Sequence, residues 1–483
     1  MLDWEIKPLP FKIYPSLPPL RLPTDLPSLD ADALATLASD PGGGAALDLE
    51  GLAALLFFSA GVTRVKTYAG GVQIHFRAAP STGALYQTEV YVVAGAVGGL
   101  EPGVYHFNPG DFSLRRLRAG DFRGAVALAA ADDALAAQPA CLVLSAMYWR
   151  NTWKYQARGY RHLFWDSGTM CAQLLATARA LDLPARLVTG FVDRQVNALL
   201  GLDAAKEGAL VLAPVGAAGA APPVSPVVSP LAPEVVPLST TEVDYPLLRQ
   251  AYDDSSLDSE AEVTAWRDHG GQVLNYDISR RPDREGRSAS AANVVIQDLT
   301  PRGLAETIAR RGSTREFSAE AIPGEALSRA LDAATRGIPL DVPDGLVDLY
   351  LTVHAVTGLA PGAYVYDRAS RSLTLLRSGE LRAQSAFLCL GQALGGTSSA
   401  TVFFLADLER VLERLGNRGY RLANLEAGLI GGRLYLAAYA QRFGATGLTF
   451  YDRAVVDFFS PHAAGKAAIF VTALGRSVRP VPA

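Results

Sequence analysis

Three residues within five positions, Arg311, Ser313 and Arg315, present two guanidinium groups and a hydroxyl. These groups suit a dianionic phosphate, because a guanidinium can donate two parallel hydrogen bonds to its oxygens. Arg476 and Arg479, near the end of the sequence, could close such a cage. Taken alone, the pattern is more typical of a capped turn with solvated arginines. The interpretation as an anion site therefore depends on how the rest of the chain is built.

The chain contains two copies of one pattern, about 259 residues apart. Gly99–Tyr105 recurs as Gly358–Tyr364 at an offset of 259, and Arg158–Arg161 recurs as Arg418–Arg421 at an offset of 260. A single register held over several blocks of this length indicates duplicated domains and not a solenoid of short repeats.

The two copies have lost complementary parts. The small polar loop Pro80–Tyr86 is matched in copy two by Pro339, after which the sequence differs. Conversely, Arg311–Arg315 is matched in copy one by the apolar run Leu52–Leu56. A Pro-Ser-Thr-Gly loop alone is more often only a turn. Because each copy keeps what the other lacks, we expect one shared cleft at a domain interface, where ligand pockets are common.

Each copy has the same order of predicted elements, with a helix, two strands, a second helix and a last strand. In copy one the predicted strands are Val90–Val93, Cys141–Leu144 and Ala209–Leu212, and the predicted helix is Asp166–Leu181. In copy two the strands are Leu349–Val353, Ala400–Leu405 and Ala468–Ala473, and the helix is Glu426–Phe443. This order predicts an α+β fold of two tandem α/β sandwich domains, packed as a pseudo-dimer about a pseudo-twofold axis.

The domain boundaries follow from shifts in composition. We expect an N-terminal arm that packs on the body, a first domain, a Pro/Ala-rich linker with a polar connector, and a second domain, at residues 1–44, 45–216, 217–300 and 301–483. Repeated proline makes the start of the linker stiff and non-helical. The connector contains one amphipathic stretch, Leu247–Leu257.

Composition excludes several classes of function. The 483 residues are 49% hydrophobic and 19% charged, with a net charge of -4, which gives no electrostatic footprint for nucleic acid or an anionic membrane. The sequence has neither a signal-like start nor an uninterrupted apolar run long enough for a membrane span. The three cysteines form no Cys-x-x-Cys pair, and the six histidines lack metal-ligand spacing. We therefore expect a cytoplasmic protein without disulfides or metal.

Copy one contains four extended motifs: PSTGALYQTEVYVV (Pro80–Val93), GLEPGVYHFNP (Gly99–Pro109), WKYQARGYRHLFWDSG (Trp153–Gly168) and GFVDRQVNALLGLD (Gly190–Asp203). Through these motifs, copy one resembles the SagB/ThcOx-type dehydrogenases of the nitroreductase superfamily. Copy two is similar to the wider superfamily in RGSTREF (Arg311–Phe317) and GATGLTFYD (Gly444–Asp452). Nitroreductase-like proteins are usually homodimers with two FMN sites at the interface. This chain resembles such a dimer, fused and reduced to one site.

The resemblance implies one FMN. Its phosphate would be held by Arg311, Ser313 and Arg315, with Arg476 and Arg479. The isoalloxazine or ribityl group would be contacted by Pro80, Ser81, Thr82 and Gly83 of copy one and would lie beside Gly444, Ala445, Thr446 and Gly447 of copy two.

The resemblance also implies catalytic residues. Lys154 and Tyr155 match the catalytic Lys-Tyr pair of azoline oxidases. A lysine kept neutral by burial could take a proton from the substrate, and the tyrosine could donate or relay one. Asp166 and Arg161 are expected to be structural, because their types persist in copy two.

Three functions agree with these residues. The first is an FMN-dependent dehydrogenase that desaturates a C–N bond in a peptide-derived azoline or similar ring and passes electrons to oxygen. The second is an NAD(P)H-dependent nitro- or quinone reductase, and the third is a non-catalytic flavin-binding protein. A peptide or small molecule is the expected substrate. Monomer and homodimer are both open, since a fused pseudo-dimer needs no second chain to complete its site.

Overall fold

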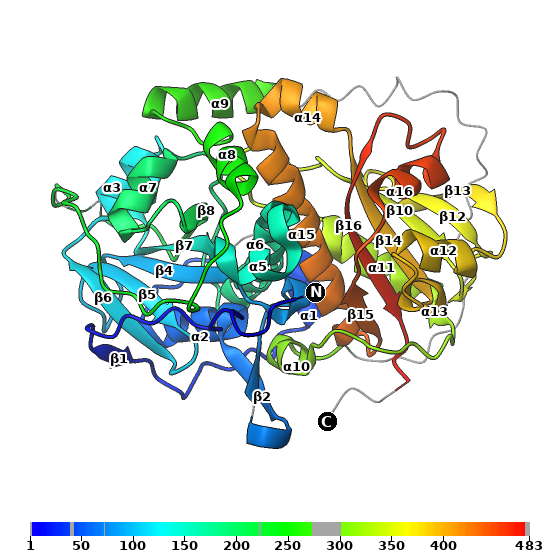
Figure 1. Ribbon diagram of the computed structural model, residues 1–483, viewed down its shortest axis with the longest axis horizontal. Coiled ribbons are helices and arrows are strands. Elements are labelled where there is room, and N and C mark those ends of the chain that lie inside the picture. The colour runs from blue at the N-terminus through cyan, green and yellow to red at the C-terminus, as the bar shows by residue number, and fades with distance from the viewer. Residues whose placement is uncertain are drawn as a thin grey trace. The chain divides into compact units, whose positions relative to one another are not determined.

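The computed structural model describes residues 2–38, 43–71, 73–220, 222, 224–272 and 301–478. The chain forms two compact units, coloured mainly blue to green and yellow to red in Figure 1. Unit 1 contains Met1–Leu29, Asp40–Gly271 and Pro339–Pro343, and unit 2 contains Asp30–Ser39, Gln272–Ile338 and Asp344–Ala483. Each unit therefore includes a short segment from the other half of the sequence.

Unit 1 is built on a six-stranded sheet in the order β1-β6-β5-β4-β7-β8, with every neighbouring pair antiparallel. The strands are β1 (Pro19–Arg21), β4 (Thr88–Ala94), β5 (Gly103–Asn108), β6 (Ser113–Ala119), β7 (Ala140–Met147) and β8 (Glu207–Val215). Every residue of β4, β5, β7 and β8 is buried. The three strands predicted for copy one are confirmed as the centres of β4, β7 and β8.

The helices of unit 1 include one long, buried helix. They are α2 (Leu49–Ala60), α3 (Arg123–Ala129), α4 (Ala134–Ala137), α5 (Tyr148–Tyr155), α6 (Gly159–Ala180), α7 (Asp193–Leu200), α8 (Pro246–Asp254) and α9 (Glu260–Gln272). The helix predicted from Asp166 begins seven residues earlier, because the aromatic run from Tyr160 to Trp165 packs inward as part of α6. The apolar run Leu52–Leu56 is fully buried in α2, which packs against α6.

Short elements complete unit 1. The strands β2 (Val62–Thr67) and β3 (Gln73–Arg77) pair as a separate hairpin, and the 3₁₀ turns are η1 (Ala69–Gly71), η2 (Thr82–Ala84) and η3 (Gln156–Arg158). In the N-terminal arm, β1 pairs with β6 and Tyr14 is buried, whereas Ile13 is exposed.

The connector is more helical than predicted. The amphipathic stretch forms α8, but α9 was not predicted because its polar sequence has no clear apolar stripe. Among the described residues between 217 and 245 there is neither helix nor strand, as repeated proline predicts.

Unit 2 has a sheet of the same kind, in the order β13-β12-β10-β14-β16-β15 and again antiparallel throughout. The strands are β10 (Asp348–Val353), β12 (Gly362–Asp367), β13 (Ser372–Ser378), β14 (Ala400–Ala406), β15 (Gly444–Gly447) and β16 (Ala467–Gly475). The three strands predicted for copy two are confirmed as β10, β14 and β16. A separate parallel pair joins β9 (Ile322–Pro323) to β11 (Val356–Thr357).

Unit 2 contains the buried helix α15 (Arg418–Ala440), against which some of its other helices pack. The others are α1 (Ala33–Ala38), α10 (Leu304–Arg310), α11 (Gly324–Thr335), α12 (Arg382–Leu388), α13 (Leu394–Thr397), α14 (Leu408–Leu415) and α16 (Asp452–Phe459). Although α1 belongs to the first half of the sequence, it packs against α11 and α15. None of the helices in the described ranges is both long enough and apolar enough to cross a membrane.

Candidate functional site

The predicted ligand loop of unit 1 has an unusual backbone. It forms the turn η2, and three of its residues have positive φ angles: Gly83 at 65°, Ala84 at 54° and Tyr86 at 51°. Two of these carry side chains, so the conformation must be stabilised by the surroundings. Contacts from α5 and α6 provide that stabilisation.

The carboxylate of Asp166, on α6, holds the start of the loop. It accepts hydrogen bonds from Ser81 Oγ at 2.5 Å, from Thr82 Oγ1 at 2.7 Å, and from the Thr82 backbone N–H at 2.9 and 3.0 Å to its two oxygens. Burial raises the pKa of Asp166 to about 6, although the hydrogen bonds from Ser81 and Thr82 oppose that rise. The two hydroxyls predicted to face the flavin therefore donate to Asp166.

A buried arginine holds the end of the loop. Arg150 Nη1, on α5, donates to the carbonyl of Tyr86 at 2.8 Å and to Glu89 Oε1 at 2.5 Å. His106 pairs with the other oxygen of Glu89 at 2.8 Å. The loop is thus held at both ends by buried charged side chains. Neither Arg150 nor Glu89 was predicted from the sequence as a site residue.

Tyr155, one of the two predicted catalytic residues, lies against this loop. A Cβ built on Gly83 would lie 2.9 Å from Tyr155 Oη and 3.2 Å from its Cε2. The ring of His162 meets the Tyr155 ring edge to face, with centroids 4.5 Å apart. Burial, assisted by the charge of Asp166, raises the pKa of Tyr155 to about 12. Tyr155 is therefore protonated at neutral pH and can donate a hydrogen bond or a proton.

Lys154 departs from the expectation. Its side chain is exposed, and its Nζ lies 5.3 Å from the centroid of the Tyr155 ring. The sequence interpretation required a lysine desolvated by burial, and this structure does not bury it. The reason lies in α5: Lys154 occupies its exposed side, whereas Trp149 and Trp153 fill the apolar cluster beneath.

In unit 2, the basic turn follows α10 and lies beside the edge strand β15. The backbone N–H of Thr314 donates to the carbonyl of Ala445 at 2.9 Å. A Cβ on Gly444 would lie only 2.0 Å from Thr314 Oγ1, so only glycine permits this approach. The structure thus brings together two motifs that are 130 residues apart in the sequence, Arg311–Arg315 and Gly444–Gly447.

A tyrosine links the same two motifs. Tyr435, on α15, has its hydroxyl 3.2 Å from Ser313 Oγ, and it accepts a hydrogen bond from the backbone N–H of Gly447 at 2.5 Å. No sequence motif identified Tyr435. Only its place on the long helix α15, which packs against β15, could have indicated that Tyr435 lies near these motifs.

The arginines of this turn suit a phosphate. Arg311 is buried, while Arg315 is exposed and forms no ion pair with another described residue. The Oγ1 of Thr314 is buried without a hydrogen-bond partner among the described residues. A free guanidinium, a second guanidinium and a hydroxyl on one turn match the donor set that a phosphate group requires, so the residues present fit FMN.

Arg476 is oriented toward a different segment. Its Nε donates to the carbonyl of Ala321 at 3.1 Å and lies 3.9 Å from Glu320 Oε2. A role at the phosphate stays a prediction for Arg476. Arg479 lies outside the described residues.

The counterpart of the Gly444–Asp452 segment in unit 1 is covered. Asp341 Oδ1 accepts hydrogen bonds from Thr189 N at 2.9 Å and Thr189 Oγ1 at 2.7 Å, and Asp341 Oδ2 accepts one from Gly190 N at 2.8 Å. Trp266, on α9, packs on Gly190, where a Cβ would lie 2.6 Å from the indole ring. By contrast, Thr449, which is the counterpart of Gly190 at the offset of 259, is only half-buried in unit 2.

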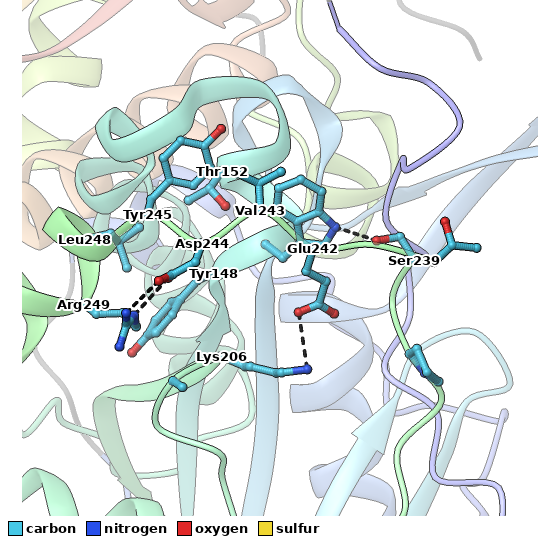
Figure 2. Close-up of a pocket in the computed structure, with 14 residues that line it drawn as sticks. Tyr148, Thr152, Lys206, Ser239, Glu242, Val243, Asp244, Tyr245, Leu248 and Arg249 are labelled. Atoms are coloured by element: carbon cyan, nitrogen blue, oxygen red, sulfur yellow. Dashed lines mark hydrogen bonds and ion pairs between the residues drawn. The ribbon is translucent and has the colours of Figure 1, made fainter.

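Unit 1 also has a pocket of about 560 Å³ that the sequence did not predict. It lies between the first turns of α5 and the segment 237–249 (Figure 2). In this pocket, Trp149 Nε1 donates a hydrogen bond to Ser239 Oγ at 2.8 Å. The charged residues that line the pocket pair with one another, Lys206 with Glu242 at 3.5 Å and Arg249 with Asp244 at 2.6 Å. None of the predicted site residues lines it. In the described part of the chain, no cluster of three metal-ligating side chains occurs.

Comparisons with known proteins agree with the duplication. The sequence profile of the nitroreductase family matches this chain twice, over residues 50–217 and 308–463. A curated protein of Methanocaldococcus jannaschii, provisionally named a nitroreductase, is 33% identical over 171 residues, which are 35% of this chain and 81% of that protein.

Solved structures support the same conclusion. A crystal structure from Anabaena variabilis, also provisionally named a nitroreductase, is 27% identical with a TM-score of 0.75, and the match covers 99% of this chain and 95% of that one. A chain of the Escherichia coli microcin synthetase McbBCD complex, solved with truncated pro-MccB17 bound, is 20% identical with a TM-score of 0.33 over 43% of this chain and 80% of that one. The predicted α+β class with two nitroreductase-like domains is confirmed.

Proposed function

Because the chain belongs to the nitroreductase family, we propose that this oxidoreductase is an FMN-dependent dehydrogenase of the SagB type. Its substrate is a peptide-derived azoline or a similar ring, in which it desaturates a C–N bond, and oxygen is the electron acceptor. The observation that carries the proposal is the contact between Tyr155 and Gly83, which joins the predicted catalytic pair to the predicted flavin loop.

The proposed FMN site uses residues from both halves of the chain. Arg311, Ser313 and Arg315 hold the phosphate, and the backbone around Gly83 and the β15 residues Gly444–Gly447 contact the rest of the cofactor. FMN held by these residues would supply the hydride acceptor for oxidation of the substrate carbon. The remaining task of the protein is to place the substrate and to move one proton.

The chain's own residues divide this task. Lys154 Nζ is exposed and lies 5.3 Å from the Tyr155 ring centroid, so in this proposal it donates a hydrogen bond to the substrate, while the proton released from the substrate passes to water. Tyr155, protonated because of its raised pKa, donates a hydrogen bond that orients the ring being oxidised.

One flavin per chain follows from the state of the counterpart segments. In unit 1, the counterpart of the basic turn is an apolar part of α2, and the counterpart of the Gly444–Asp452 segment is covered by Asp341 and Trp266. In unit 2, Arg315 of the basic turn is exposed, and Thr449, the counterpart of Gly190, is half-buried. These differences support a single site that uses the unit 2 phosphate motif.

The test is flavin stoichiometry with a matched control. We expect about one FMN per purified chain, and loss of that FMN in the double variant Arg311→Ala, Arg315→Ala. Arg453→Ala is the control, since Arg453 is an exposed arginine of the same unit whose nearest acid is Asp457 at 3.8 Å. Two FMN per chain, or equal loss in the control, would contradict the proposal.

A second function is favoured by the names of two relatives. The M. jannaschii protein and the A. variabilis structure, which share long matches with this chain, are both named as nitroreductases. An NAD(P)H-dependent nitro- or quinone reductase would bind the same FMN but would bleach it on addition of NAD(P)H under anaerobic conditions. The dehydrogenase should leave the flavin oxidised under NAD(P)H and reduce it with an azoline-containing peptide.

A further inference from the structure

Two buried carboxylates occupy matching positions in the duplicated chain. Asp166 lies on α6 of unit 1 and Glu426 on α15 of unit 2, at the offset of 260 that relates the two helices. Each side chain is buried. Each accepts hydrogen bonds from the loop that precedes the first central strand of its own sheet, β4 or β10. The carboxylate is therefore a loop anchor in both copies.

The two anchors differ in their partners. Glu426 accepts from the backbone N–H groups of Gly345 and Leu346 and pairs with Arg368 at 2.8 Å, so its charge is balanced. Asp166 has only neutral donors, those of Ser81, Thr82 and the Gln87 side chain, and forms no ion pair with the rest of the described chain. The copy that keeps the ligand loop thus keeps an unbalanced buried charge beneath it.

This arrangement determines what the loop can offer to a ligand. Both loop hydroxyls donate to Asp166, Ser81 Oγ also accepts from the N–H of Tyr86 at 2.9 Å, and the N–H of Thr82 is occupied. What remains exposed is Gly83, directly beside Tyr155. The left-handed residues that follow require such an anchor, because their conformation is unfavourable in an isolated chain.

We propose that Asp166 is a positioning residue for the flavin site. Its ionised carboxylate turns the Ser81 and Thr82 side chains inward, so that the Gly83 backbone and Tyr155 Oη are presented to the flavin. The inference rests on the proposed FMN function and deepens it. Asp166 acts through the loop and does not itself touch the cofactor.

The pH of the medium gives a readout independent of catalysis. Protonation of Asp166 would replace an acceptor oxygen by a donor, which competes with the donors of Ser81 and Thr82. The charge of Asp166 acts on Tyr155 of α5, and because the pKa of Tyr155 is raised to about 12, this tyrosine stays neutral throughout the range. The nearby His162 has its pKa lowered by burial to about 3 and also stays neutral above pH 5.

The experiment measures FMN affinity by quenching of flavin fluorescence between pH 5 and 8, with thermal unfolding of each apoprotein beside it. We expect Asp166→Asn to raise the Kd for FMN at least tenfold at pH 7.5, and wild-type affinity to fall below about pH 6 while that of the variant stays level. Glu426→Gln is the matched control, with an equally buried carboxylate, and its Kd should stay within twofold of wild type.

Each outcome decides one claim. If Asp166→Asn binds FMN as tightly as wild type with the same pH profile, the positioning role is wrong while the FMN function stands. If wild type binds no FMN at any pH, the proposed function and this inference both fail. If Asp166→Asn does not fold, Ser81→Ala, which removes one donor to Asp166, must reproduce the weaker binding, and an unchanged affinity in that variant overturns the role.

Discussion

Gly83 and Tyr155 are in such close contact that residue 83 has no space for a side chain. A Cβ there would lie 2.9 Å from Tyr155 Oη, and the φ angle of +65° is one that only glycine adopts without strain. The two residues come from different motifs, a loop and a helix end. Their contact means that the position of the phenol and the shape of the loop cannot change independently.

Replacing Gly83 should therefore affect the flavin site more than the fold. We expect Gly83→Ala to weaken FMN binding about tenfold, because Tyr155 or the loop must shift, while the left-handed backbone costs about 1 kcal/mol of folding stability. Gly70→Ala is the control: its φ is +81°, but no atom lies within 4 Å of its Cβ position. Flavin titration and thermal unfolding separate the two effects, and equal affinities would contradict the contact's importance.

The proposed catalytic pair should influence turnover and not cofactor binding. We expect Lys154→Ala and Tyr155→Phe each to lower the oxidation rate of an azoline-containing peptide by about 100-fold or more, with FMN content unchanged. Lys66→Ala is a matched control, since Lys66 Nζ lies 4.7 Å from the Tyr68 ring centroid in an arrangement like that of Lys154 and Tyr155. Full activity in both site variants would contradict a catalytic role for Lys154 and Tyr155, whereas bound FMN without peptide oxidation in the wild type would favour a non-catalytic flavin-binding protein.

Asp166 should make folding stability depend on pH in a defined direction. Its pKa is about 6 in the folded protein, above its ordinary value of 3.8, so the folded state binds a proton more tightly than the unfolded state. This group therefore lowers stability as pH rises from about 4 to about 6, by roughly 3 kcal/mol. The difference in urea unfolding free energy between wild type and Asp166→Asn, measured at pH 4.5 and pH 7, should show that trend. A difference that does not vary with pH would contradict it.

The N-terminal arm should depend on one buried ion pair. Lys12 Nζ lies 2.5 Å from Glu207 Oε2 and 2.8 Å from Tyr91 Oη, and both charged side chains are buried. Lys12→Met should cost about 3–5 kcal/mol, because it leaves Glu207 buried and uncompensated. The double variant Lys12→Met, Glu207→Gln should recover part of that loss. Urea unfolding of both variants checks this, and additive losses would contradict the pairing.

Most of the fold could be predicted because strand burial leaves a clear signal. Buried strands such as β7 and β16 appear in the sequence as nearly continuous apolar runs. The repeat then relates each strand of one half to its counterpart in the other half. The start of α6 was missed because its aromatic residues face inward on all sides, which erases helical periodicity.

The site could be predicted only in its motifs. Arg311–Arg315 and Gly444–Gly447 were recognised separately from the sequence, and in the structure a hydrogen bond from Thr314 to Ala445 joins them. The supporting residues Arg150 and Tyr435 belong to no motif. The sequence alone does not distinguish them from other buried polar residues of α5 and α15. The burial assumed for Lys154 failed because sequence does not reveal which side of a short helix faces solvent.

Because each unit includes a short segment from the other half of the sequence, a single cut cannot divide the chain into two complete units. A polypeptide cut within residues 273–300 would leave its first product without Pro339–Pro343, and with it the carboxylate that satisfies the Thr189 and Gly190 donors. The second product would lack α1, which packs on α11 and α15. Each unit thus needs a short segment that belongs to the other half of the sequence. A single cut between the halves would therefore remove part of the packing from both units.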